Sequence, residues 1–140
     1  MQNSRLILYH QQAISARTLF VLLNERVCIF EPLPSTAQYH QGSDNTVVVA
    51  HPAPILSQAE DFFGLAAGAL AIDKTFHEQV DTSEGPISVY LAHFTTVDAP
   101  YEVVAQAQGR FIPLTESPRY ASTTELELLR RAYSVIMETV

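Results

Sequence analysis

Apolar residues occur along this chain in two spacings, and each spacing predicts a different kind of element. Continuous runs rich in β-branched and aromatic residues predict strands over 5–10 and 46–51, the second of them a buried central strand. A hairpin is predicted over 18–34, with its tight turn at Asn24-Glu25. A second hairpin is predicted where 74–80 and 86–97 flank the polar loop "DTSEG". A short helix over 100–109 and a strand over 110–116 are expected further along, and 36–45 reads as a polar loop.

Helical spacing first appears in the segment from Ile55 to Phe63, whose sequence includes "SQAEDFF". Pro52 and Pro54 are expected to keep the backbone extended until this helix starts, and Gly64 fits a left-handed C-cap. The predicted buried stripe consists of Leu56, Ala59, Phe63 and Ala66. The residues between them, including Gln58, Glu60 and Asp61, are then expected to form a solvated face.

The C-terminal segment carries the most regular helical pattern. "STTE" at 122–125 is a capping box, in which Ser and Glu side chains bond each other's backbone N–H groups. The predicted apolar stripe consists of Leu126, Leu129, Tyr133 and Ile136, with Leu128, Ala132 and Val135 beside it. Glu127 and Arg131 are spaced to form an i,i+4 ion pair on the outer face.

The length of 140 residues fits a single domain, taken here as 1–140. Strands outnumber helices, and the helices are scattered between them, so the order predicts a mixed α/β (α+β) fold in which helices sandwich a mixed β-sheet.

Composition narrows the range of partners. Charged residues make up 16% of the chain and hydrophobic residues 47%, so much of the surface must be uncharged, which favours an oligomer interface. The net charge of −7 argues against nucleic acid and anionic membranes, and the apolar runs are too short to span a bilayer. Cys28 is the single cysteine, no signal peptide is visible, and a cytoplasmic location is expected.

The order of elements resembles the Nudix hydrolase superfamily from about Thr18 to Glu138. The residues that carry the resemblance are the apolar strand "TVVVAH", the helix ending in Gly64-Leu65, the arm "VYLAHF", and "FIPLTE" before the closing helix. "GLAAGALAIDKTFHEQV" resembles the stretch that leaves the catalytic helix of that family. The resemblance implies a Nudix-like fold. Together with the low charged fraction, the frequency of dimers in that family leads us to expect a homodimer.

The defining box of that family, G-x5-E-x7-R-E-U-x-E-E-x-G-U, where U is a bulky apolar residue, is degenerate here. With its last glycine on Gly64, its two apolar positions fall on Ala59 and Leu65. The remaining positions depart from the pattern and fall on Ser43, Val49, Ser57, Gln58, Asp61 and Phe62.

These departures matter because a hard divalent ion needs several oxygen ligands. Asp61 is the one carboxylate at a position where the box has an acid, so it is the candidate metal ligand. Glu60 lies about 100° away around the helix. The resemblance also makes Glu102 a candidate, because some family members draw a general base from such a loop.

Candidate ligand-binding residues are His51, Gln58 and Glu116. His51, His77 and His93 lack metal-site spacing, and His77 and His93 would lie far apart on the second hairpin, so strand histidines with satisfied partners are expected. Glu78 should face away from His77, and Cys28 should be a buried thiol.

Two functional classes remain open. The first is a Nudix-like module without pyrophosphohydrolase activity and without a cofactor, binding a small ligand or a protein partner. The second is a Mg²⁺- or Mn²⁺-dependent pyrophosphohydrolase of a nucleoside diphosphate derivative, with Asp61, Glu60 and Glu102 as its catalytic candidates.

Overall fold

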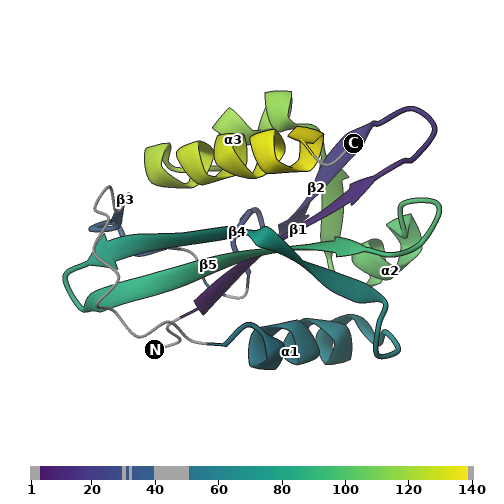
Figure 1. Ribbon diagram of the computed structural model, residues 1–140, viewed down its shortest axis with the longest axis horizontal. Coiled ribbons are helices and arrows are strands. Elements are labelled where there is room, and N and C mark those ends of the chain that lie inside the picture. Colours follow the sequence, from purple (N-terminus) through teal and green to yellow (C-terminus); the bar gives the residue numbers. More distant parts are fainter. Residues whose placement is uncertain (1–3, 30, 32, 40–50, 139–140) are drawn as a thin grey trace.

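The protein is built around a six-stranded mixed sheet with helices on both faces, as seen in a computed structural model (Figure 1). The structure describes residues 4–29, 31, 33–39 and 51–138. The strand order is β3-β4-β5-β1-β2-β6, and the central pair β1–β5 is parallel whereas the other pairs are antiparallel. The predicted single-domain α+β class, with helices sandwiching a mixed sheet, is confirmed.

Six strands make the sheet, and their bounds follow the apolar runs. They are β1 (Ser4–Gln11), β2 (Thr18–Leu23), β3 (Gln38–Tyr39), β4 (Leu70–Thr82), β5 (Gly85–Phe94) and β6 (Gly109–Ile112). β4 and β5 form the predicted hairpin, joined by a two-residue turn between Thr82 and Gly85. The predicted strand over 46–51 falls almost entirely outside the described residues, and only His51 is seen.

The first predicted hairpin is confirmed in its turn and only partly in its second arm. Asn24 and Glu25 have φ values of 52° and 63°, the left-handed pair that a two-residue hairpin turn requires. The chain beyond the turn does not form a regular strand. Val27–Ile29 is buried, but its backbone is tied to the sheet through an isolated bridge from Ile29 to Leu6.

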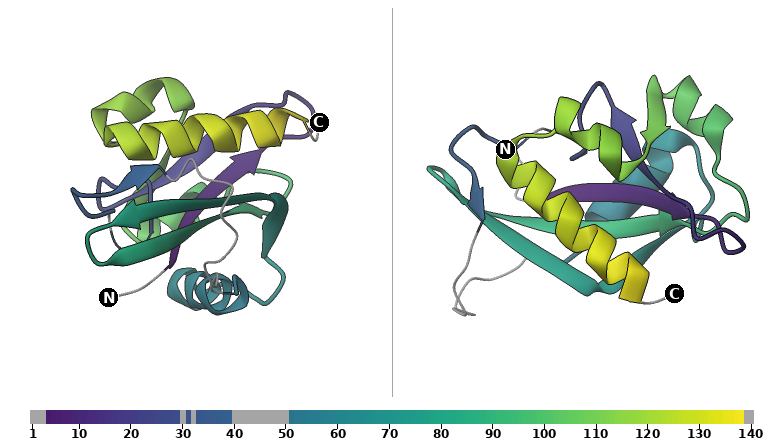
Figure 2. Two further views of the ribbon diagram at one scale, coloured as in Figure 1. Left: turned by 60° about the vertical axis from the view of Figure 1, so that its left-hand side comes forward. Right: turned by 90° about the horizontal axis from the view of Figure 1, so that it is seen from above.

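The helix α1 (Ala53–Phe63) packs on one face of the sheet and α3 (Thr123–Glu138) on the other (Figures 1 and 2). α1 begins earlier than expected because Pro52 adopts a helical conformation and Pro54 stands in the first turn, where its missing N–H is not needed. Gly64 closes α1 with φ 68°, as predicted. The buried residues of α1 are Ile55, Ala59, Glu60 and Phe63, and Leu56 is half-buried against the same core cluster. The expected stripe is wrong at Ala66, which is exposed and lies beyond the end of α1.

The capping box of α3 is formed as predicted. The Glu125 N–H donates to Ser122 Oγ over 3.2 Å, and the Ser122 N–H donates to Glu125 Oε1 over 2.9 Å. The Glu127–Arg131 ion pair is present at 3.3 Å. The predicted apolar face is largely confirmed, because Leu128, Leu129, Ala132 and Ile136 are buried. Tyr133 and Val135 are partly buried against the same core. Glu125 is buried as well, which the pattern did not predict.

The region between β5 and α3 differs from the prediction in two places. The short helix α2 (Tyr101–Gln106) ends before Gly109, and Gln108 takes the left-handed conformation with φ 65°. Gly109 instead allows β6 to approach β2, because a Cβ there would lie 2.8 Å from the Leu22 carbonyl oxygen. β6 stops at Ile112, and Pro113 introduces the 3-10 helix η1 (Leu114–Arg119) where a longer strand was expected.

Apolar side chains divide between the two faces of the sheet. One cluster lies under α3 and includes Phe20, Leu91 and Leu129. The other lies under α1 and α2 and includes Leu8, Phe63 and Val104. Within the described part of the chain, no helix is long and apolar enough to cross a membrane.

Candidate functional site

β4 loses its register with β5 at one point, and that irregularity creates the candidate site. Ile72 pairs with Ala92 and His77 pairs with Tyr90, so four residues of β4 stand opposite Leu91 alone. An excess of residues on one strand bends it and redirects its side chains. Asp73 is the first residue of this stretch, and it lies on the face of the sheet that α3 covers.

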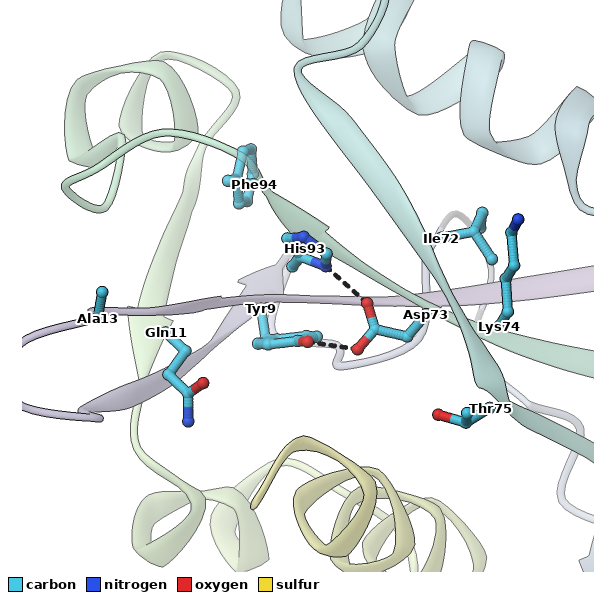
Figure 3. A pocket seen from close by; sticks show the side chains of 9 residues that line it. All are labelled: Tyr9, Gln11, Ala13, Ile72, Asp73, Lys74, Thr75, His93 and Phe94. Atoms are coloured by element: carbon cyan, nitrogen blue, oxygen red, sulfur yellow. Dashed lines mark hydrogen bonds and ion pairs between the residues drawn. The ribbon is translucent and has the colours of Figure 1, made fainter. Parts of the chain in front are cut away.

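Three polar side chains from three adjacent strands meet at Asp73. Tyr9 of β1 and His93 of β5 are register partners, and both lie beside Asp73 of β4. His93 Nδ1 lies 2.6 Å from Asp73 Oδ1, and the Tyr9 hydroxyl donates to Asp73 Oδ2 (Figure 3). The Tyr9 and His93 rings are 5.6 Å apart between centroids. Strand pairing therefore brings together residues that are 64 and 20 positions apart in sequence.

Burial determines the electrostatics of this cluster. The Asp73 side chain is 9% exposed, and a carboxylate so shielded from water needs hydrogen-bond donors. Tyr9 and His93 are such donors. Burial, followed by the hydrogen bond to Asp73 and the charge of that carboxylate, raises the pKa of the Tyr9 phenol well above its ordinary value. Tyr9 therefore stays protonated and remains a donor.

A pocket of about 540 Å³ opens beside the cluster. Its wall combines polar groups with apolar surface, and it is lined by Tyr9, Gln11, Ala13, Ile72, Asp73, Lys74, Thr75, His93 and Phe94. Figure 3 shows Gln11, Asp73 and Thr75 projecting to one side of the strands, while Ile72 and Lys74 project to the other. The Gln11 amide is held by Thr18 Oγ1 at 3.2 Å, which ties the pocket wall to β2.

Glu60, one of the predicted catalytic candidates, has a different environment from the one expected. It is buried, with 8% of its surface exposed, so its assignment to a solvated helix face is wrong. Its Oε2 accepts hydrogen bonds from the backbone N–H groups of Gly68 (2.9 Å) and Leu70 (3.4 Å). The carboxylate thus fastens the turn that links α1 to β4.

The other acidic candidates and Gln58 lie at the surface. Asp61 and Gln58 are exposed on α1. Glu102 is exposed in the first turn of α2, and Glu116 is exposed in the first turn of η1, so both lie in short helices rather than in loops. Their positions at the N-terminal ends of these elements suit acidic side chains.

His51 lies apart from the Asp73 cluster. It is exposed, and its Nδ1 accepts a hydrogen bond of 3.1 Å from the Ala53 N–H at the start of α1. It shares a second pocket, of about 330 Å³, with His77 and Tyr90, whose rings are stacked 5.5 Å apart. His77 and Glu78 have separate surroundings, since Glu78 reaches Arg131 of α3 at 3.8 Å.

The structure tests whether the acidic candidates could share a metal ion. Among the described residues, no group of three or more His, Cys, Asp or Glu side chains could hold one. Asp61, Glu60 and Glu102 are therefore not assembled into a metal site here. The expectation for Cys28 is met, because it is buried and this burial raises the pKa of its thiol.

The sequence pattern did not identify Tyr9 or Asp73, and it placed His93 only as a strand residue with a partner. A signal for Asp73 exists in retrospect: it is a carboxylate inside the apolar-rich run "ALAID" at a strand. A buried acid requires hydrogen-bond donors. The donors of Asp73 lie on neighbouring strands, so they can be identified only when the strand order is known. That order includes the parallel β1–β5 contact, which local patterns do not reveal.

Fold and site together define a single-domain α+β protein with a Tyr-Asp-His cluster beside an open pocket. Neither the scan against protein-family models nor the search of curated proteins found a match for the chain. The resemblance to Nudix hydrolases stays a prediction.

Proposed function

We propose that this protein is a small-molecule-binding domain whose ligand occupies the pocket beside Asp73. The observation that carries the proposal is the convergence of two side-chain donors, Tyr9 and His93, on one shielded carboxylate at the wall of that pocket. Ligand pockets commonly measure about 300–1,000 Å³ and combine apolar walls with a few fixed polar groups. The volume of about 540 Å³ and the mixed lining agree with both features.

The position of the cluster supports binding over a purely structural role. A polar network that only stabilised the sheet could lie wholly inside the core, but the His93 side chain is 37% exposed. Polar groups at such a site are already oriented by the protein, so a ligand need not order them on binding. Ile72 and Phe94 supply apolar surface to the same pocket.

The proposal includes the absence of Mg²⁺-dependent pyrophosphohydrolase activity above background. A divalent ion that sheds water needs several oxygen ligands in return. On α1, Glu60 Oε2 is already bonded to two backbone N–H groups, and Phe62 stands where the Nudix box has an acid. Assays of nucleoside diphosphate derivatives with Mg²⁺ and Mn²⁺ test this part, and hydrolysis abolished by Asp61→Ala would contradict it.

Ligand binding is tested by a thermal-stabilisation screen with nucleotides and sugars, because a compound that binds only the folded state raises the melting temperature. Each compound that stabilises the parent is repeated with Asp73→Asn and with Asp61→Ala. We expect the stabilisation to be lost in Asp73→Asn and kept in Asp61→Ala. The reverse pattern would place the ligand near α1.

We also propose that the protein forms a homodimer. The small charged fraction of 16% supports this, as do large apolar side chains at the surface, of which Ile14 is 96% and Val97 is 82% exposed. Sedimentation at tens of micromolar tests it, and a species of 15.5 kDa alone would contradict it.

A further inference from the structure

The His93 imidazole is oriented by its contact with Asp73. An ionised carboxylate can only accept hydrogen bonds, so the short contact of 2.6 Å requires the hydrogen on Nδ1. In a neutral ring this leaves a lone pair on Nε2. Among the described residues, no hydrogen bond to Nε2 is found. The His93 side chain is 37% exposed and lines the pocket, so a ligand or water there can reach the ring.

Tyr9 holds the Asp73 carboxylate from the side opposite His93. Its hydroxyl donates to the second oxygen of Asp73, so the carboxylate is held on both sides. A histidine whose Nδ1–H is held by a buried carboxylate has a fixed tautomer and orientation. The negative charge of the carboxylate also stabilises the imidazolium that forms when Nε2 takes up a proton.

We infer that His93 is a general base that removes a proton from water bound in this pocket, and that the chemistry it supports is hydrolysis of a small ester. The inference rests on the proposed ligand pocket and adds a reaction to it. The water oxygen bonds to the acyl carbon while Nε2 takes the proton. The bond from that carbon to the leaving oxygen then breaks, and the proton returns from Nε2 to the leaving group or to solvent.

We take water as the proton source because no hydroxyl or thiol of the described residues is hydrogen-bonded to His93. None of the described hydrogen bonds joins His93 to a serine, threonine or cysteine, and Cys28 is buried in the core. Thr75, whose hydroxyl lies on the Asp73 side of the strand, and the Gln11 amide are the polar neutral groups that line the pocket beside it (Figure 3). Asp73 and Tyr9 act through His93 and are positioning residues, whereas His93 is the catalytic residue.

The test uses p-nitrophenyl acetate as the probe and the full chain as the enzyme. Hydrolysis yields acetate and coloured p-nitrophenolate, and needs no other reactant than water. We expect a protein-dependent rate that His93→Asn lowers about 10²-fold, the lower range for general-base catalysis. Asn keeps a donor for Asp73 but has no group at the Nε2 position. His77→Asn, at the other pocket, is the matched control and should keep the parental rate.

Asp73→Asn provides a second readout that a merely structural role would not change. The amide has one accepting oxygen and one NH2 donor where the carboxylate had two accepting oxygens, so the preference of His93 for the Nδ1–H tautomer should weaken. We expect the rate to fall together with the change of tautomer, which ¹⁵N NMR of the imidazole reports. We also expect the parental rate to be slower in deuterium oxide, since a proton moves in the rate-determining step.

A rate that His93→Asn leaves unchanged would overturn the inference, and so would the lack of any protein-dependent rate. Neither result would touch the ligand-binding proposal, which depends on thermal stabilisation being lost in Asp73→Asn. A rate that is insensitive to deuterium and shows a burst of p-nitrophenolate equal to the protein concentration would also overturn it, because the imidazole would then be attacking the ester directly.

Discussion

Two buried carboxylates at different places in the fold, Glu60 of α1 and Asp73 of β4, show how partners decide the role of an acid. Both carboxylates are shielded from water: Glu60 is 8% exposed as a whole residue, and the side chain of Asp73 is 9% exposed. Glu60 Oε2 is bonded to two backbone N–H groups of one turn, so it holds the chain in place. Asp73 is bonded to the side chains of Tyr9 and His93 beside an open pocket.

The difference teaches that burial alone does not indicate a site. A carboxylate whose donors are backbone groups replaces local backbone hydrogen bonds and stabilises the fold. A carboxylate whose donors are side chains orients those side chains. In the second arrangement the oriented side chain, His93, lines a pocket and is 37% exposed.

The largest expected effect is at Phe63, which anchors α1 to the sheet. It is 8% exposed and packs edge-on against Phe94 at 6.2 Å. We expect Phe63→Ala to lower the free energy of unfolding by about 3–5 kcal/mol, because the change leaves a cavity in the core. Urea titration measures this loss.

Phe62→Ala is the matched control for that change. Phe62 is 48% exposed, so its truncation should cost less than about 1 kcal/mol. Equal losses in the two variants would contradict the view that α1 is a packing element whose inner face carries the stability.

Glu60→Ala removes the acceptor that holds the turn between α1 and β4. We expect the free energy of unfolding to fall by about 1.5–3 kcal/mol, the range for hydrogen bonds to a charged group. Asp61→Ala, one residue further on and exposed, should stay within about 0.5 kcal/mol of the parent. Chemical denaturation of both variants checks this. A larger loss at Asp61 would reverse the roles assigned to the two acids.

Tyr9→Phe tests the Asp73 side of the comparison with little change in shape. The variant loses one hydrogen bond to the carboxylate, and we expect a cost of about 1 kcal/mol in unfolding free energy. Tyr101→Phe, at a tyrosine that is 55% exposed, is the control and should be close to neutral. A neutral result at Tyr9 would mean that its hydroxyl does not support Asp73 in solution.

The smallest expected effect concerns alkaline pH. The pKa values of Tyr9 and Cys28 are raised in the folded state, so the folded protein keeps both protons after the unfolded chain has released them. Stability is therefore fully present below the unfolded pKa values, about 8.5 for Cys and 10 for Tyr, and falls as pH rises through them.

Stability should therefore fall less steeply with pH in the variants that lack these groups. We expect the slope to be smaller above pH of about 10 in Tyr9→Phe and smaller near pH of about 8.5 in Cys28→Ala. Thermal unfolding from neutral to alkaline pH measures both slopes. Slopes identical to that of the parent would show that neither group is protonated preferentially in the folded state.

Local patterns in the sequence were sufficient for much of the fold. The capping box at Ser122, the glycine C-cap at Gly64 and the turn at Asn24-Glu25 are all present, because each depends on residues a few positions apart. The burial of single acids on the helices, Glu60 and Glu125, was less predictable. Which face of a helix is buried depends on the sheet beneath it, and the burial of Glu60 follows from backbone donors in the next turn of the chain.

Local sequence patterns could not predict the candidate site, because its residues become neighbours only through the order in which the strands pair. Tyr9 and His93 become neighbours through a parallel pair, and Asp73 reaches them through an irregularity in β4. The resemblance to the Nudix box favoured the acids on α1 instead. His93 was correctly expected to have a partner, but that partner comes from another strand.

The most direct test of the central claim is to locate where a stabilising compound from the ligand screen binds. Amide ¹H–¹⁵N spectra of the labelled protein are recorded with increasing compound, and the shifted signals are assigned. The account predicts that the largest shifts occur at Tyr9, Asp73, His93 and Phe94, and that they disappear in Asp73→Asn. Shifts centred on Gln58 and Asp61 of α1, unchanged by Asp73→Asn, would contradict it.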